Sequence, residues 1–367
     1  MVAGSPPPAE PRAGVPLAPC TTLGVGGPAR WFADATRAED VAAYAAWAAV
    51  RGLDLFVLGG GSNLVIADTG IDALVLRMAM AGTQWRASGD DRLVKAAAGE
   101  PWDDVVAGAV ARGWHGIECL SGIPGSVGGT PIQNVGAYGQ EVSDTIRAVT
   151  AFDRTTGALT TFGAADCGFA YRTSRFKTVD RGRFVICDVT YALRGELAAP
   201  AYPDVREALA RAGVVSATAA DVRRAVLEVR RRKGMVVDAS DPDTRSVGSF
   251  FMNPVVDRAL HQRVAAAAGT AVPAFALPDG RVKIPAAWLI ERAGFARGHR
   301  DGRAAISTRH TLALVNAGGA TARDILRLAV HIKRTVRERW GVSLCAEPVC
   351  VGFGPDADVS YLQGAED

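Results

Sequence analysis

The sequence contains no paired-cysteine motif and no histidine spacing of the kind that binds metal. Its 367 residues include five histidines, none in an HExxH arrangement, and six cysteines, none in a CxxC pair. Zinc sites and thiol redox centres usually show such spacings. We therefore expect no metal site and a protein whose thiols stay reduced, as is typical of the cytoplasm. The cysteines are Cys20, Cys119, Cys167, Cys187, Cys345 and Cys350.

Long apolar runs and a strong excess of one charge are also missing. No segment approaches the roughly eighteen consecutive apolar residues of a membrane span, so we expect no membrane insertion. The formal net charge is only +3, which argues against a dedicated nucleic-acid-binding protein. The segment before Cys20 is broken by repeated prolines and lacks a charged start and an apolar core. We interpret it as a disordered lead and not as a secretory signal.

Helix and strand patterns alternate along the chain, which indicates a mixed fold of roughly two or three domains. A boundary is expected near Gly234, where a cluster of turn residues at 238–243 breaks the periodicity. Helical spacing of apolar residues predicts helices over 38–51, 102–112, 218–232 and 321–340. Short apolar runs predict strands at 55–58, 64–66, 74–76, 93–96, 149–152, 159–162, 184–187 and 312–315, and a closing strand within 342–351.

Three consecutive glycines are the most informative feature that is present. They follow the predicted strand 55–58, and backbone without Cβ atoms can bring its N–H groups against anionic oxygens. The loop lacks the lysine of a P-loop and the GxGxxG spacing of a Rossmann fold. One such run is also compatible with a flexible turn, but a second glycine-rich stretch at 122–139 favours a large phosphate-bearing cofactor. The first loop reads Gly59, Gly60, Gly61, Ser62 and Asn63.

Six segments in this order resemble the UDP-N-acetylenolpyruvoylglucosamine reductase family, flavoenzymes of peptidoglycan precursor synthesis. The resemblance covers about residues 21–351, nearly all of the expected folded chain. It implies an α+β protein with a vanillyl-alcohol-oxidase (PCMH) type FAD-binding fold in two subdomains, followed by an α+β substrate-binding domain. The segments are TTLGVGGPAR, VLGGGSNLVIAD, GIECLSGIPGSVGGTPIQNVGAYG, YRTSRFK, VGSFFMNP and CAEP.

The resemblance also implies a domain plan and an activity. After a disordered lead over 1–20, we expect FAD-binding subdomains at 21–85 and 86–233, a substrate domain at 234–355 and a tail at 356–367. A cytoplasmic monomer would use NADPH and non-covalent FAD to reduce UDP-N-acetylglucosamine enolpyruvate to UDP-N-acetylmuramate. Two alternatives remain open. One is an FAD-linked oxidase of the same fold that acts on an alcohol or sugar, and the other is a non-catalytic nucleotide-binding protein.

Reduction of an enol ether conjugated to a carboxylate needs a cation or acid for the developing charge and a proton donor. Arg172 suits the carboxylate because a guanidinium matches its geometry and stays charged. Glu347, placed in the predicted closing strand, is expected to have a raised pKa and to share a proton with the enolate. Ser249 lies between a glycine and two phenylalanines. From the residues alone, a surface arginine and a core or turn serine are the more common cases, and Glu347 could equally be an exposed glutamate at a strand end. The resemblance reverses this: it implies that Ser249 donates the proton and that Arg172 and Glu347 stabilise the enolate.

The remaining site residues are assigned to cofactor and substrate. The first glycine loop is expected at the FAD diphosphate, and the second near the isoalloxazine or ribityl chain. Lys233 is also explained by the preference of helix C-termini for cations, and Tyr202 is a candidate gate over the diphosphate. The expected cofactor residues of the second loop are Gly125, Ser126, Gly129, Gly136 and Tyr138. The expected substrate residues are Tyr171, Tyr202, Lys233, Asn253 and His310.

Overall fold

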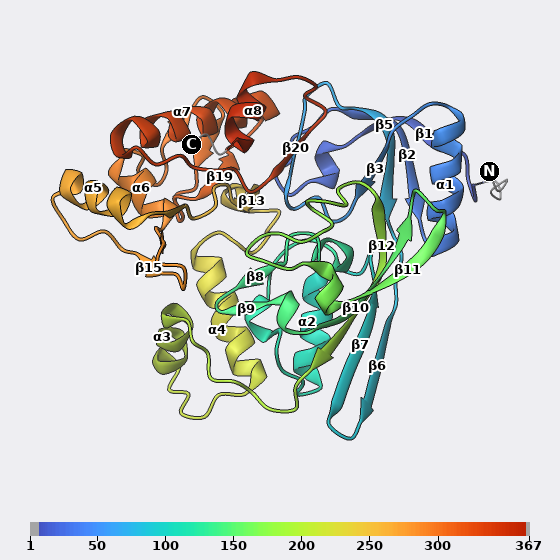
Figure 1. Ribbon diagram of the computed structural model, residues 1–367, viewed down its shortest axis with the longest axis horizontal. Coiled ribbons are helices and arrows are strands. Elements are labelled where there is room, and N and C mark those ends of the chain that lie inside the picture. Colours follow the sequence, from blue (N-terminus) through green and yellow to red (C-terminus); the bar gives the residue numbers. More distant parts are fainter. Residues whose placement is uncertain (1–6, 365–367) are drawn as a thin grey trace. The chain divides into compact units, whose positions relative to one another are not determined.

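The computed structural model describes residues 7–364 and divides into two compact units (Figure 1). Among the described residues, unit 1 comprises 7–15, Ala29–Gly61 and Asp72–Val236. Unit 2 comprises Pro16–Pro28, Ser62–Ile71 and 237–364. The first glycine loop therefore begins in one unit and ends in the other. Residues 1–6 of the expected lead and residues 365–367 of the expected tail lie outside the described residues.

A four-stranded sheet and one helix form the first layer of unit 1. The sheet has the order β1-β2-β5-β3, in which β3 and β5 run parallel. The helix α1 (Ala38–Val50) buries Tyr44 and Trp47 against this sheet region. It begins where the Asp40 carboxylate accepts hydrogen bonds from backbone N–H groups, which satisfies donors that a helix start leaves unpaired. The strands are β1 (Arg12–Pro16), β2 (Pro28–Ala35), β3 (Leu55–Leu58) and β5 (Ile71–Met78).

A five-stranded antiparallel sheet with the order β11-β10-β12-β7-β6 forms the second part of unit 1. Helix α2 buries Trp102 against Tyr191 of β12, with ring centroids 5.4 Å apart. Helices α3 and α4 pack together beside the second glycine-rich stretch. The strands are β6 (Thr83–Ser88), β7 (Asp91–Ala97), β10 (Ile146–Asp153), β11 (Ala158–Gly163) and β12 (Phe184–Leu193), with a small hairpin of β8 (Gly136–Ala137) and β9 (Gln140–Glu141). The helices are α2 (Trp102–Ala111), α3 (Pro203–Arg211) and α4 (Ala219–Arg232).

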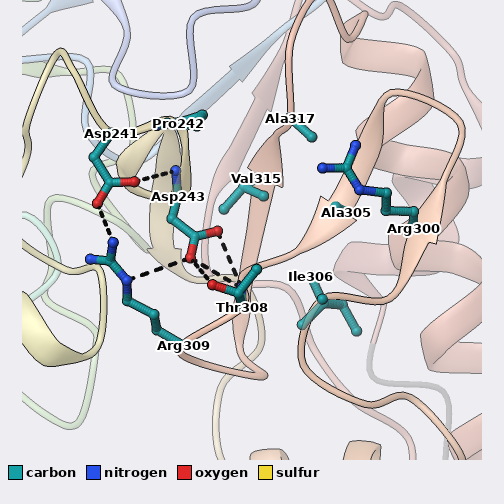
Figure 2. A pocket seen from close by; sticks show the side chains of 11 residues that line it. Asp241, Pro242, Asp243, Arg300, Ala305, Ile306, Thr308, Arg309, Val315 and Ala317 are labelled. Carbon is teal, nitrogen blue, oxygen red and sulfur yellow. Dashed lines mark hydrogen bonds and ion pairs between the residues drawn. The ribbon is translucent and has the colours of Figure 1, made fainter.

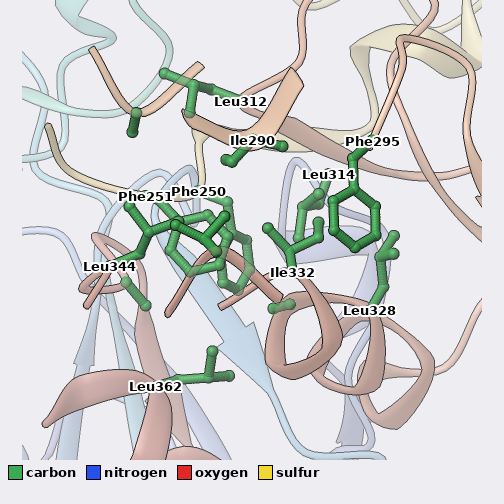
Figure 3. Packing of buried hydrophobic residues seen from close by; sticks show 14 of the residues in the cluster. Phe250, Phe251, Ile290, Phe295, Leu312, Leu314, Leu328, Ile332, Leu344 and Leu362 are labelled. Carbon is green, nitrogen blue, oxygen red and sulfur yellow. The ribbon is translucent and has the colours of Figure 1, made fainter. Parts of the chain in front are cut away.

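Unit 2 combines short sheets with four helices around an aromatic core. Phe250 and Phe251 lie in the middle of the apolar cluster shown in Figure 3, with ring centroids 5.2 Å apart. Figure 1 shows helices α7 and α8 side by side. The sheets have the orders β13-β19-β18-β17, β14-β16-β15 and β20-β4. The helices are α5 (Arg258–Ala268), α6 (Ala286–Arg292), α7 (Ala322–Trp340) and α8 (Ala357–Gln363).

The strands of unit 2 are short. Strand β4 joins β20 in parallel, with Leu64 opposite Val349. The strands are β4 (Leu64–Ile66), β13 (Ser246–Ser249), β14 (Val255–Val256), β15 (Phe275–Ala276), β16 (Val282–Lys283), β17 (Arg300–Asp301), β18 (Ala304–Ile306), β19 (Ala313–Asn316) and β20 (Val349–Val351). Within the described residues, none of the helices combines the length and the apolar character that crossing a membrane would need.

The long predicted helices are confirmed as α1, α2, α4 and α7, and the predicted strands with strong apolar runs are also present. Three details differ. Strand β1 and a short 3-10 helix form within the lead that was expected to be disordered, because Leu17 is completely buried. The closing strand begins only at Val349, so Glu347 precedes it. The expected tail contains α8, which is held by the completely buried Leu362.

Candidate flavin and substrate sites

Two glycine-rich loops of unit 1 lie directly against each other. A Cβ atom on Gly60 would be 2.6 Å from the Cα atom of Gly125, and one on Gly59 would be 2.8 Å from Ser126 Oγ. Gly125 also has a φ of 120°, which side chains rarely allow. The close packing therefore requires glycine at these positions, which the sequence predicts to bind a cofactor.

The two glycine loops in contact are called the glycine cradle below, and Ser126 gives this cradle an unpaired polar atom. The residue is 8 % exposed, and its Oγ atom is buried with no hydrogen-bond partner in residues 7–364. Leaving a buried hydroxyl unpaired costs about 1–3 kcal/mol, so a ligand atom at this position would remove the cost. The bare loops and the unpaired hydroxyl fit an anionic, hydrogen-bonding cofactor such as FAD. Gly129 lies in the same segment, and a Cβ atom there would meet nothing within 4 Å.

Arg172 is held by the carbonyl groups of the second loop, in unit 1. Its Nη2 donates to the Gly136 carbonyl at 2.6 Å and its Nη1 to the Asn134 carbonyl at 3.4 Å. The guanidinium carbon lies 5.4 Å from the centre of the Tyr171 ring. The structure thus brings together three predicted residues, Arg172, Tyr171 and Gly136. Sequence reasoning missed Asn134.

Positive φ angles mark the same region. Among the described residues, only three that are not glycine have a positive φ, namely Asn134 (46°), Tyr138 (51°) and Arg172 (55°). Such conformations are uncommon for residues with a Cβ atom and often occur at functional sites. All three lie in the second loop or contact its carbonyl groups.

Tyr138 groups with two of the expected substrate residues. Its ring meets the Tyr202 ring edge-on at 5.2 Å, and Lys233 Nζ lies 5.9 Å from its centre. Burial raises the pKa of Tyr138, while Arg230 and Lys233 act in the opposite direction. Lys233 Nζ also bonds to Asp204 at 2.6 Å. Sequence reasoning missed Asp204 and Arg230, because neither belongs to a recognisable motif.

Ser249 and Glu347 are brought together in unit 2. The Glu347 N–H donates to the carbonyl of Phe250, the residue after Ser249, at 2.9 Å. Asn63 Nδ2 donates to the Glu347 carbonyl at 3.4 Å. The Val349 N–H in turn donates to the Asn63 carbonyl at 2.9 Å. Glu347 and Asn63 therefore share a backbone network with Phe250, the residue next to Ser249.

The other expected residues of unit 2 lie on neighbouring elements. Asn253 Oδ1 accepts a hydrogen bond at 2.9 Å from the N–H of Ala286, the first residue of α6. His310 precedes β19, and its carbonyl accepts from the Ala313 N–H at 3.1 Å. Ala313 is paired with Ser249 across β13 and β19, so the turn that contains His310 leads into the strand beside Ser249. Ser62 lies at the start of the second segment of unit 2.

Unit 2 also contains a pocket, with charged residues along part of an otherwise largely apolar lining, that sequence reasoning missed (Figure 2). Arg309 Nη2 lies 2.6 Å from the Asp241 carboxylate, and Arg309 Nε lies 3.7 Å from that of Asp243. Thr308 donates to Asp243 from both its N–H and its hydroxyl group. These four residues form a paired network along one wall, and Figure 2 shows Arg300 across from it.

Comparison with known families identifies the class of protein to which this geometry belongs. Residues 29–163 match the family described as FAD binding domain. This match, the bare glycine cradle and the mixed helices and sheets define a flavoprotein with the FAD-binding fold of the vanillyl-alcohol-oxidase (PCMH) type. The predicted fold class is confirmed. Residues 241–351 match the C-terminal domain of UDP-N-acetylenolpyruvoylglucosamine reductase.

Full-length relatives establish the family. The chain is 48 % identical over 347 residues to UDP-N-acetylenolpyruvoylglucosamine reductase of Thermobifida fusca, covering 92 % of this chain and 97 % of the relative. The Mycobacterium tuberculosis enzyme is 47 % identical, with 92 % and 94 % covered. The crystal structure of the Thermus caldophilus reductase matches with a TM-score of 0.63 and 27 % identity over 93 % of this chain and 100 % of that one. The chain belongs to the UDP-N-acetylenolpyruvoylglucosamine reductase family and is an FAD-dependent oxidoreductase.

Proposed function

We propose that this enzyme reduces UDP-N-acetylglucosamine enolpyruvate to UDP-N-acetylmuramate with NADPH, as a cytoplasmic step of peptidoglycan precursor synthesis. The observation that carries the proposal is the similarity to reductases of this name at 47–48 % identity along more than nine-tenths of the chain. The cradle with its unpaired Ser126 hydroxyl supports the use of FAD. We further propose that the enzyme acts as a monomer.

Bound FAD would supply a carrier that takes two electrons from NADPH and passes a hydride to the enolpyruvyl double bond. The chain's own residues would bind and orient the reactants. Backbone N–H groups of Gly59, Gly60 and Gly61, with Ser62 and Asn63, are proposed at the FAD diphosphate. Gly125, Ser126, Gly129 and Gly136 are proposed near its ring or ribityl chain. No residue is proposed to form a covalent link to the cofactor.

Arg172 is proposed to bind the substrate carboxylate. Hydride addition at one carbon of the double bond leaves negative charge on the neighbouring carbon and in the conjugated carboxylate. A fixed guanidinium stabilises that charge as it develops. Two carbonyl groups orient Arg172 before any substrate arrives, which reduces the cost of reorganisation.

Ser249 and Glu347 are proposed to complete the reduction. The Ser249 hydroxyl would donate its proton to the carbanion, so that an O–H bond breaks as a C–H bond forms. Glu347 would share a proton with the enolate form of the carboxylate. Their neighbouring backbones in unit 2 support a joint role. Arg172 belongs to unit 1, and its convergence with this pair on one substrate stays a prediction.

An anaerobic half-reaction experiment tests the function and the proton donor together. NADPH should bleach the flavin absorbance, and the enolpyruvyl sugar nucleotide should restore it. The Ser249→Ala variant should be bleached at nearly the wild-type rate, whereas its recovery should slow by about 10²–10⁴-fold, as for loss of a general acid. Ser246→Ala, which removes a hydroxyl from the same strand, is the matched control.

Three outcomes would count against this assignment. Equal slowing of both half-reactions in Ser249→Ala would contradict a role in proton donation. Failure of the sugar nucleotide to reoxidise the wild-type enzyme would contradict the proposed substrate. Prompt reoxidation by air without the nucleotide would instead indicate an oxidase.

A further inference from the structure

An ion pair anchors the start of α3 to the end of α4 in unit 1. Asp204 lies in the first turn of α3, and Lys233 directly follows α4. The carboxylate oxygen and the ammonium nitrogen are 2.6 Å apart, and the two side chains are 39 % and 33 % exposed. Tyr202 immediately precedes α3, and its ring contacts the Tyr138 ring edge-on.

A second cation lies one turn away and is incompletely paired. Arg230 is only 9 % exposed. Its Nη2 donates to the Met235 carbonyl at 2.7 Å, and the guanidinium also interacts with Tyr138 and Asp103, but its Nε has no hydrogen-bond partner in the described chain. Burying a polar group without a partner is unfavourable, so this one nitrogen is available to a ligand acceptor.

The acidic groups near these cations are few. Asp103 is engaged by both terminal nitrogens of Arg223 at 2.6 and 2.8 Å. Asp204 is therefore the carboxylate that balances Lys233 directly. If Asp204 moved away, Lys233 and Arg230 would leave a positive site next to two tyrosine rings. Such a site suits the diphosphate group of a nucleotide.

We propose that Asp204 is an internal competitor for the nucleotide diphosphate, which must displace it from Lys233 in order to bind. The inference rests on the proposed function, in which Lys233 and Tyr202 bind the substrate. A diphosphate has more negative charge and more acceptor oxygens than one carboxylate, so it can replace Asp204.

The test uses the FAD-loaded enzyme and UDP as the probe, with the dissociation constant measured by calorimetry. Removing the competitor in Asp204→Asn should strengthen UDP binding by about two- to fivefold, the range expected for a partly exposed ion pair. Glu207→Gln is the matched control, because it removes the same charge from the same helix and should leave the constant unchanged. Flavin absorbance should be normal in both variants.

A double variant isolates the proposed contact. Lys233→Met should weaken UDP binding, and adding Asp204→Asn to it should give no further change, since the competitor acts only through Lys233. An equal gain in the Lys233→Met background, or no gain in Asp204→Asn alone, would overturn the inference while turnover of the wild-type enzyme upholds the proposed function. Absence of UDP binding by the wild-type enzyme would overturn the inference, whereas only a failure of the sugar nucleotide to reoxidise the reduced flavin would overturn the proposed function.

Discussion

At the scale of single residues, a methyl group at position 60 has no room in unit 1. The position of its carbon would be 2.6 Å from Gly125 Cα, which is backbone and cannot rotate away. The two loops would have to separate, and overpacking of this kind typically costs about 1–3 kcal/mol. Because both loops are proposed to hold FAD, the strain should appear as weaker cofactor binding.

We therefore expect Gly60→Ala to weaken FAD binding by about ten- to a hundredfold, as measured by fluorescence titration of the apoprotein. Gly195→Ala serves as the control, since its nearest neighbour would be Arg92 Nη2 at 3.9 Å, an ordinary contact. Unchanged FAD affinity in Gly60→Ala would show that the cradle does not hold the cofactor.

At the scale of residues, the sequence predicts where glycines leave the backbone without side chains. It does not predict which residues contact each other. Three adjacent glycines are visible in the chain, and so is the second loop. The contact of Gly60 with Gly125 and the ion pair of Asp204 with Lys233 join positions far apart in sequence. Arg230 is likewise hidden, because in a row of arginines at a helix end nothing distinguishes the buried one from its exposed neighbours.

At the scale of elements, Asp103 ties three segments of unit 1 together. It lies in the first turn of α2, accepts a hydrogen bond from the Gly122 N–H of the second loop at 2.6 Å, and pairs with Arg223 of α4. Burial alone would raise the pKa of Asp103, but the bonds from Arg223 and Gly122 lower it below its ordinary value of 3.8. The charged carboxylate therefore stabilises the folded state.

The expected pH dependence follows from this direction. A carboxylate with a lowered pKa in the folded state contributes its full stability above the pKa of the unfolded state, and loses it as the pH falls through the folded value. Asp103→Asn should lower the free energy of unfolding by roughly 1–3 kcal/mol at pH 7, as for loss of charged hydrogen bonds. The difference from wild type should shrink below about pH 4. Urea unfolding at pH 7 and pH 3.5 measures both.

A matched variant makes the result specific. Asp104→Asn changes the neighbouring carboxylate of the same helix turn and should have a much smaller effect at pH 7. A difference between Asp103→Asn and wild type that is the same at both pH values would contradict the role of the ionised group.

Four of the longer helices were predictable, although α5, with 11 residues, was missed, and the shortest strands were not predictable. Helices α1, α2, α4 and α7 show apolar spacing over ten residues or more, so their periodicity is clear. Strands β14, β15 and β16 have two residues each, which is too few for any period to appear. Helix α3 was missed because its first residue is Pro203, in a segment interpreted as a mobile loop; proline is in fact well suited to a first helical position.

At the scale of the whole molecule, none of the six cysteines forms a disulfide within the described residues, and burial raises the pKa of four of the thiols. Burial raises the pKa of Cys119 and Cys350 to about 12, and that of Cys167 and Cys187 to about 11. At pH 8 a thiol with a pKa of 11 is ionised in only about one molecule in a thousand, and the thiolate is the reactive form.

We expect iodoacetamide at pH 8 to leave the buried thiols of Cys119, Cys167 and Cys187 unmodified in the native enzyme, while the partly exposed Cys20 reacts first. Peptide mapping by mass spectrometry gives the extent at each site. The same treatment in 6 M guanidinium, roughly the concentration that unfolds even very stable domains, should modify all six. Fast modification of Cys187 in the native enzyme would show that its strand opens readily.

The two units could not be delimited from the sequence. Unit 2 takes residues 16–28 and 62–71 from the first quarter of the chain, and no local pattern reveals a partner so distant. Strand β4 was predicted, but its pairing with β20 was not.

That pairing has a consequence for biosynthesis. Leu64 leaves the ribosome long before its neighbour Val349 is made. Until Val349 has emerged, β4 lacks β20 as its partner, and Asn63 lacks the amide of Val349 that its carbonyl accepts. Domains generally fold as they are made. A nascent chain stalled before residue 349 would therefore contain the glycines of the first loop, but the strand β4 that follows them could not yet pair with β20.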